Sequence, residues 1–182
     1  MPSTKSRLYL DKTSIRPRSG YKGQNRKNRI FLYPMKIAIL NGPNLNRLGM
    51  RKPDIYGTKT MAQILLDIQQ RWPEVHLVYR QSNHEGDLID WIQEANSQAL
   101  TADSPYDGVV LNAGGYSHTS VALRDAVEES EVPVVEVHIS DINQREPFRR
   151  TSLLTDVCTH SIIGHGTKGY EEAVEYIITT VH

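Results

Sequence analysis

The feature that most constrains the fold of this chain of 182 residues is an alternation between two hydrophobic periods that begins at Met35. Short apolar runs of the kind found in buried strands predict strands at 36–40, 75–79, 108–111, 132–139 and 161–163. Between and after these runs, helices are predicted at 61–68, 88–99, 119–129 and 173–181. Strand and helix therefore follow one another almost without interruption.

This alternation favours right-handed βαβ crossovers, which produce a parallel sheet covered by helices on both faces. We therefore predict one α/β domain over residues 35–182, with five parallel strands in three layers, in an order that resembles the doubly wound flavodoxin-like fold. Ligands of such sheets bind outside the carboxyl ends of the strands. Functional residues are thus expected in the loops at 41–59, 81–86, 112–118, 139–150 and 164–168.

The charge of the chain is zero overall but unevenly distributed. Residues 1–34 contain nine Lys or Arg and one acidic residue, whereas residues 35–182 contain 12 basic and 20 acidic residues. We expect the first 34 residues to be a basic extension that is disordered or removed; a transit segment, an upstream mis-start and a nucleic-acid-binding arm are the alternatives. Because the following domain is acidic, we expect no nucleic-acid partner.

Cysteine content and hydropathy indicate where the protein works. Cys158 is the only cysteine, which excludes an intramolecular disulfide and a cysteine-based zinc site and fits the reducing cytoplasm. No apolar run approaches the roughly 20 residues of a membrane span, so no membrane partner is expected. No histidine or carboxylate spacing is typical of metal ligands, so we expect neither a metal nor a cofactor.

The loop after the first predicted strand is unusually long and runs from Asn41 to Gly57. Loops longer than about 12–15 residues in compact domains are often lids or binding loops. This one carries Asn44, Arg47, Arg51 and Tyr56 at the edge where a ligand is expected. A surface loop whose polar groups face water is the alternative.

The third predicted strand ends in Leu111-Asn-Ala-Gly-Gly-Tyr-Ser-His118, directly before a helix. Glycines there allow a ligand to approach backbone N–H groups at a positive helix N-terminus, which favours an anion or a hydroxyl-rich ligand. The segment is neither a dinucleotide-binding motif nor a P-loop, so a nucleotide is not indicated. A structural role, with Ser117 or Thr119 capping the helix, is the alternative.

Glu136 and His138 lie two positions apart in the fourth predicted strand, so they share one face at its carboxyl end. A carboxylate beside an imidazole fixes the tautomer and favours the protonated ring, as a general acid requires. Arg145 and Arg149 follow one helical turn apart, and guanidinium groups bind carboxylates and vicinal hydroxyls. A structural ion pair and a solvated cationic face are the alternatives.

Four motifs at successive strand ends carry a family resemblance. They are Asn41-Gly-Pro-Asn-Leu-Asn-Arg-Leu-Gly49, Gln81-Ser-Asn-His-Glu-Gly86, Leu111-Asn-Ala-Gly-Gly-Tyr-Ser-His-Thr-Ser-Val-Ala-Leu-Arg-Asp125 and Glu136-Val-His-Ile-Ser140. Through them the chain resembles the type II 3-dehydroquinate dehydratases from Met35 to about its C-terminus. The resemblance implies a shikimate-pathway lyase that removes water from 3-dehydroquinate by reversible anti elimination, through an enolate and without a metal or Schiff base.

The resemblance also implies how the chemistry is divided among residues. Tyr56 matches the family's base, and Arg51 matches a cation that favours the tyrosinate, since a tyrosine with a pKa of about 10 is only about 0.1% ionised at neutral pH. Asn44 matches the residue that, with a water, holds the enolate oxygen. His138, oriented by Glu136, matches the proton donor to the departing hydroxyl.

A further set matches the family's substrate-binding residues, namely Asn112, His118, Asp125, Ile139, Ser140, Arg145 and Arg149. Among them, the backbone N–H groups of Ile139 and Ser140 match the carboxylate site, and Arg145 matches a lid residue. Asp125 matches a residue that reaches the substrate of a neighbouring subunit, and Asn112, His118 and Arg149 match the groups that bind the hydroxyls. The family assembles as trimers grouped into a dodecamer, so a homo-oligomer is implied.

The alternative function is that of a flavodoxin-like binding module without catalysis. Such a module has no need for an Arg–Tyr pair on one loop and a Glu–His pair opposite it, so we favour an enzyme. The sequence leaves open whether that enzyme is biosynthetic or acts in quinate breakdown.

Overall fold

The computed structural model describes residues 35–50, 58–96 and 106–181. Their strands are β1 (Lys36–Asn41), β2 (His76–Gln81), β3 (Gly108–Asn112), β4 (Val134–His138) and β5 (His160–Ile163). Their α-helices are α2 (Met61–Arg71), α3 (Glu85–Asn96), α4 (Val121–Glu128) and α5 (Lys168–Val181). Short 3₁₀ helices are η2 (Leu45–Arg47), η3 (Gly114–His118), η4 (Ile142–Gln144) and η5 (Pro147–Arg149).

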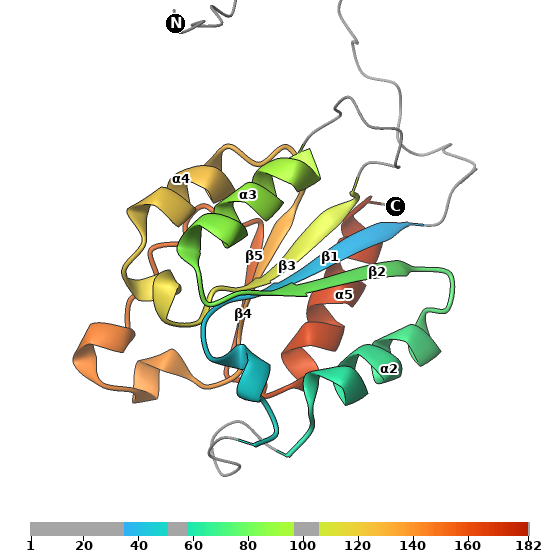
Figure 1. Ribbon diagram of the computed structural model, residues 1–182, viewed down its shortest axis with the longest axis horizontal. Coiled ribbons are helices and arrows are strands. Elements are labelled where there is room, and N and C mark those ends of the chain that lie inside the picture. Colours follow the sequence, from blue (N-terminus) through green and yellow to red (C-terminus); the bar gives the residue numbers. More distant parts are fainter. Residues whose placement is uncertain (1–34, 51–57, 97–105, 182) are drawn as a thin grey trace, which may run out of the picture.

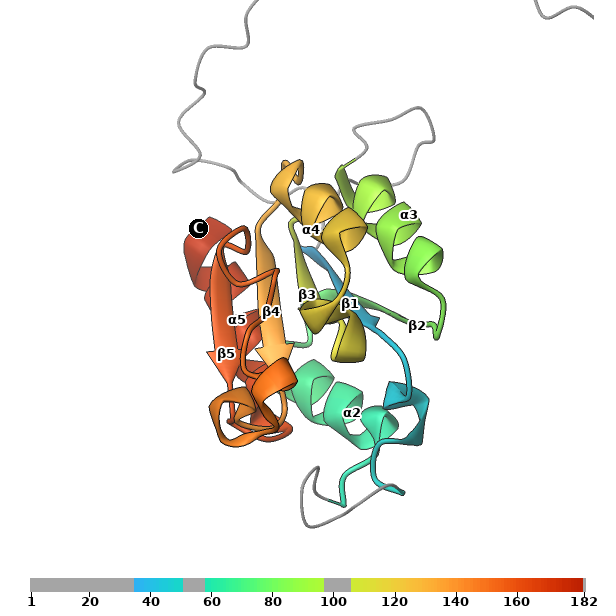
Figure 2. The ribbon, with the colours of Figure 1, turned by 90° about the vertical axis from the view of Figure 1, so that its left-hand side faces the viewer.

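The five strands form one parallel sheet in the order β2-β1-β3-β4-β5 (Figure 1). The helices α3 and α4 cover one face and α2 and α5 cover the other, which gives three layers (Figure 2). This arrangement confirms the predicted flavodoxin-like order, in which the chain moves outward in both directions from the β1–β3 pair. The predicted basic extension, residues 1–34, lies outside the described residues.

Alternation along the central strands divides the hydrophobic side chains between two cores. In β1, Ile37 and Ile39 pack on the side of α2 and α5, whereas Ala38 and Leu40 pack on the side of α3 and α4. Because both faces are covered, the strand sequence reads as one continuous apolar run. The strand ends differ from the prediction by no more than two residues.

The start of α4 differs from the one that the sequence suggested. The N-cap of α4 is Ser120, whose hydroxyl accepts the Leu123 N–H at 2.8 Å. The alternative in which Ser117 or Thr119 caps this helix is therefore wrong. The 3₁₀ helix η3 takes up the preceding residues, and the Ser117 hydroxyl donates to the Gly114 carbonyl at 2.8 Å instead. The first turn of helix thus begins later than its sequence suggested.

One buried hydrogen-bond bridge joins α5 to the centre of the sheet. Asn41 and Asn112 are register partners at the carboxyl ends of β1 and β3. The Tyr170 hydroxyl donates to Asn41 Oδ1 at 2.9 Å and accepts from Asn112 Nδ2 at 2.8 Å, and all three side chains are buried. The bridge fixes the two strand ends where the sheet order reverses, and where a doubly wound fold binds its ligand.

Across the described residues, no helix combines the length and apolarity that crossing a membrane requires.

We predict that Tyr170→Phe lowers the free energy of unfolding by about 1–3 kcal/mol, because two buried amides lose a partner that water cannot replace. Urea denaturation measures this change. Tyr176→Phe on the same helix is the control, since that half-buried ring stacks on His160 with centroids 4.4 Å apart. Equal losses for the two variants would contradict a special role for the bridge.

Candidate active site

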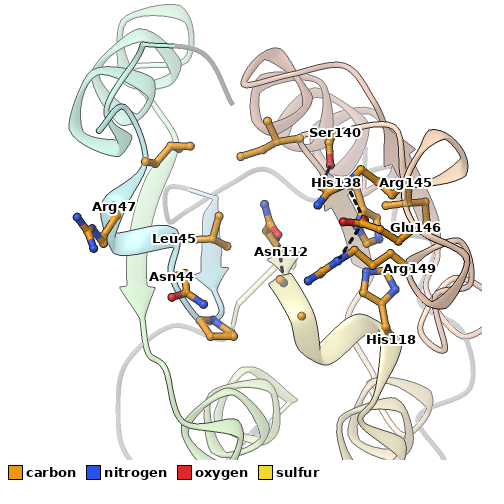
Figure 3. A pocket seen from close by; sticks show the side chains of 16 residues that line it. Asn44, Leu45, Arg47, Asn112, His118, His138, Ser140, Arg145, Glu146 and Arg149 are labelled. Carbon is orange, nitrogen blue, oxygen red and sulfur yellow. Dashed lines mark hydrogen bonds and ion pairs between the residues drawn. The ribbon is translucent and has the colours of Figure 1, made fainter. Parts of the chain in front are cut away.

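A cavity of about 290 Å³ opens above the carboxyl ends of β1, β3 and β4 (Figure 3). Its walls come from the loop with η2, from η3, and from the segment with η4 and η5. Its volume is close to the lower limit of ligand sites, which run from about 300 to 1,000 Å³. The cavity therefore lies at the predicted ligand edge and suits a small molecule.

The structure brings most of the predicted site residues together. Those that line the cavity are Asn44, Asn112, His118, His138, Ile139, Ser140, Arg145 and Arg149. Glu136 lies directly behind His138 and is hydrogen-bonded to it. Asp125 is exposed on α4 and does not line this cavity. Arg51 and Tyr56 lie outside the described residues.

Asn44 enters the cavity from a left-handed backbone conformation, with φ of 68° and ψ of −1°. Asparagine tolerates this region better than most residues. Its N–H donates to Asn83 Oδ1 at 2.9 Å, and Gln81 Nε2 donates to the same oxygen at 3.3 Å. The loop after β2 thus holds Asn44 in place, which gives the second sequence motif a structural role.

Gly42 allows the loops after β1 and β3 to touch. Its N–H donates to the Asn112 carbonyl at 2.8 Å. A Cβ at this position would lie 2.4 Å from the Ala113 carbonyl oxygen, a distance that no relaxed contact has. Glycine is therefore required here for Asn44 to reach the same cavity as Asn112.

Glu136 is a fully buried carboxylate. Burial by itself raises its pKa, but hydrogen bonds from His138, Ser152 and Thr155 and the charge of His138 outweigh burial and hold the pKa below the ordinary value. The group is therefore an anion at neutral pH. Because an anion only accepts, the bond of 2.7 Å places a hydrogen on His138 Nε2 and leaves Nδ1 as the nitrogen that can exchange a proton.

His118 stacks on His138 with ring centroids 6.0 Å apart, but its environment is different. Its Nδ1 lies 2.8 Å from the Thr151 carbonyl, which can only accept, so Nδ1 carries the hydrogen. Burial lowers the pKa of His118, and the charges of His138 and Arg149 lower it further, whereas the bond to Thr151 raises it. A neutral ring follows, whose Nε2 can accept a hydrogen bond from a ligand hydroxyl.

The two arginines of the third wall differ from their predicted arrangement. Arg145 has extended backbone after η4, and Arg149 lies in η5, so they do not share one helix; Pro147 starts the second turn. Glu146 Oε2 lies 3.3 Å from Arg145 Nε and 3.6 Å from Arg149 Nε. Among the described residues, the buried Arg149 Nε has no hydrogen-bond partner, which leaves it for a ligand.

Several contributing residues were not predicted from the sequence. Glu146 lines the cavity, as does Arg47 of the long first loop, which was expected there, and three hydroxyls contact Glu136, those of Ser152, Thr155 and Ser161. Glu146 was recognisable from its place between two arginines. The hydroxyls follow no period and carried no such signal.

The chemical character of the cavity is that of a site for a small hydroxylated anion. Asn112 lies in the middle of the cavity, with Asn44 and Arg47 on one side (Figure 3). On the other side lie His118, His138, Arg145 and Arg149. Within residues 35–50, 58–96 and 106–181, no cluster of three or more His, Cys, Asp or Glu side chains has the geometry to hold a metal ion.

A family model described as dehydroquinase class II matches residues 35–178. The chain belongs to the class II dehydroquinase family. Among its relatives, the 3-dehydroquinate dehydratase of Bacillus pumilus is 48% identical over 145 residues, which cover 79% of this chain and 94% of the relative. That of Bacillus subtilis is also 48% identical over 145 residues, covering 79% of this chain and 93% of the relative.

Solved structures agree with this class II dehydroquinase assignment. The type II dehydroquinase of Butyrivibrio crossotus superimposes with a TM-score of 0.72 at 41% identity, covering 79% of this chain and 97% of the other. The type II dehydroquinase of Propionibacterium acnes gives a TM-score of 0.71 at 37% identity, covering 81% and 98%.

We predict that Gly42→Ala destabilises this class II dehydroquinase by about 1–3 kcal/mol, because the methyl group pushes the β1 and β3 loops apart. Gly86→Ala is the matched control, since a Cβ there meets nothing within 4 Å and lies in α3. The control should be neutral or stabilising by up to about 1 kcal/mol. Urea unfolding compares the two, and a Gly42 variant as stable as the control would show that the contact can relax.

Proposed function

We propose that this chain is a 3-dehydroquinate dehydratase, a hydro-lyase that converts 3-dehydroquinate to 3-dehydroshikimate and water. The observation that carries the proposal is the buried Glu136–His138 pair, which meets Asn44 and Arg149 in one cavity. In this reaction a base removes a proton beside the ketone, an enolate forms, and the C–O bond breaks as the departing oxygen gains a proton. The family membership of the chain supports the same reaction.

The acid half of the proposed mechanism belongs to His138. Protonated on Nδ1, its ring gives that proton to the departing hydroxyl, which leaves as water with the electron pair of the C–O bond. Glu136 holds the opposite nitrogen at 2.7 Å and so orients the ring. The neighbouring His118 is neutral and carries its hydrogen on Nδ1, so its Nε2 accepts a hydrogen bond from a substrate hydroxyl without competing as an acid.

The base half rests on the family resemblance. Tyr56 is the proposed base and Arg51 the cation that favours its ionised form; both lie outside the described residues. Asn44 faces the cavity and is proposed to stabilise the enolate oxygen. Hydrogen-bond donors stabilise an enolate most effectively when they are fixed in place before the reaction. The bond from the Asn44 backbone N–H to Asn83 holds Asn44 in this way.

The remaining substrate contacts are proposed from the lining of the cavity. Asn112 and Arg149 bind hydroxyls, the backbone of Ile139 and Ser140 binds the carboxylate, and Arg145 closes over them. The Arg149 Nε, which makes no hydrogen bond within the described residues, supports its part in this set.

We also propose that the protein is a homo-oligomer, as a dodecamer of four trimers, and that it works in the cytoplasm. Asp125 supports an assembly, because it is exposed on α4 and does not line the cavity of its own chain. A carboxylate in that place can serve a substrate only in a neighbouring subunit. The single thiol, Cys158, supports a reducing compartment.

We predict that the purified chain, mixed with 3-dehydroquinate, produces the absorbance of a conjugated enone. His138→Asn should slow this dehydration about 10²–10⁴-fold, the usual contribution of a general acid. His76→Asn is the control, since His76 is exposed at the opposite end of β2 from the cavity. No enone from the folded wild-type protein would contradict the proposed function, and a wild-type rate for His138→Asn would remove that residue as the acid.

For the base, we predict that Tyr56→Phe abolishes turnover while 3-dehydroquinate still binds, because only the ionisable oxygen is lost. Arg51→Ala should lose most of the rate, whereas Lys52→Ala on the same loop should not. Steady-state kinetics give the rates, and calorimetric titration gives the binding. A near-normal rate for Arg51→Ala would show that this cation does not activate the tyrosine.

A further inference from the structure

The Glu136 carboxylate is surrounded by three hydroxyl groups that the proposed mechanism does not use. Ser152 Oγ donates to Oε1 at 2.5 Å, Thr155 Oγ1 donates to Oε2 at 2.8 Å, and Ser161 Oγ donates to Oε2 at 3.0 Å. With His138 Nε2 on Oε1 at 2.7 Å, each carboxylate oxygen accepts two hydrogen bonds. A carboxylate offers about four lone-pair sites, so this one is saturated.

The hydroxyls reach Glu136 from two parts of the chain. Ser152 and Thr155 lie in the segment that joins η5 to β5, and Ser161 lies in β5 beside Glu136, as its register partner. The Leu154 N–H donates to Ser152 Oγ at 3.1 Å, which fixes that hydroxyl in place. The group is therefore ordered by backbone as well as by the carboxylate itself.

Other charges near this group are few among the described residues. His118 of η3 stacks on His138, and the charge of Arg149 in η5 helps to lower the pKa of His118. Arg124 of α4 donates to the Leu153 carbonyl at 2.5 Å. Burial, with a smaller effect from Glu136, raises the pKa of the Cys158 thiol, which therefore stays neutral. Within the part of the chain that the structure describes, only the His138 ring can place a positive charge in direct contact with Glu136.

A proton donor at His138 thus meets an electrostatic problem. While the ring is protonated, Glu136 has a cation beside it. Once the proton has left, a fully buried carboxylate remains beside a neutral ring, and an uncompensated buried charge is costly. That cost would make His138 hold its proton tightly and donate it poorly.

We propose that Ser152, Thr155 and Ser161 are positioning residues that keep Glu136 an anion after His138 has given up its proton. Three neutral donors stabilise the carboxylate without adding a charge, so the same arrangement serves both protonation states of the ring. The expected effect on the reaction rate rests on the proposed dehydration, whereas the expected effect on the titration of the Glu136–His138 pair does not.

The test is an NMR titration of the full chain with its histidine rings labelled at ¹³Cε1. Thr155→Val and Ser161→Ala each remove one hydroxyl, and His138→Asn assigns the resonance. The pH at which the Glu136–His138 pair loses its last proton should rise by about one unit in each variant. The reason is that the lost hydrogen bond stabilises the pair most when His138 is neutral. The alkaline limb of the kcat profile should move the same way, with little change in KM.

Two further variants isolate the effect of the hydroxyl. Thr155→Ser keeps the oxygen and should restore the wild-type titration. Thr179→Val is the same change of shape on the exposed end of α5, where the hydroxyl donates to the Glu175 and Tyr176 carbonyls, each at 3.0 Å, and it should shift nothing.

An unchanged or lowered midpoint in the Thr155 and Ser161 variants would overturn the inference. Ser161→Ala, the smallest change, decides the matter if Thr155→Val does not fold. Shifted titrations in a protein that fails to dehydrate 3-dehydroquinate would support the role of the hydroxyls and reject the proposed function.

Discussion

The Tyr170 hydroxyl, buried between Asn41 and Asn112, is the contact on which the site depends. It ties α5 to the ends of β1 and β3, where the sheet order changes direction. A parallel sheet leaves polar backbone and side chains at these ends, and without a partner they would be costly to bury. By satisfying both amides, one side chain allows the strands to end together, and the loops above them to meet around a cavity.

The cavity has two sides of different character. The side formed by β1 and β3 carries the amides of Asn44 and Asn112, fixed by hydrogen bonds to Asn83 and Tyr170, together with Arg47 and His118. The side formed after β4 carries His138, which is paired with a buried carboxylate, and two further arginines. A reaction that passes through an enolate on one side and loses a hydroxyl on the other matches this division.

The buried charge of Glu136 is compatible with the core because neutral donors surround it. A permanent cation beside Glu136 would repel the protonated ring of His138, whereas neutral hydroxyls stabilise the carboxylate in both states of His138 without adding a charge. The connection from η5 to β5 therefore does more than join two elements, since it supplies two of those hydroxyls. The site reaches below the cavity floor into the body of the sheet.

Local periodicity determined the strands, the helices and their parallel order, because short-range patterns and crossover handedness are written along the chain. Alternation in β4 likewise placed Glu136 and His138 on one face. The arginine pair, and the alternative cap considered for α4, differ in the structure because η3 and Pro147 alter the local path of the chain. Only the tertiary structure revealed the hydroxyls around Glu136, because Ser152, Thr155 and Ser161 meet one carboxylate through folding in space and share no spacing that sequence could show.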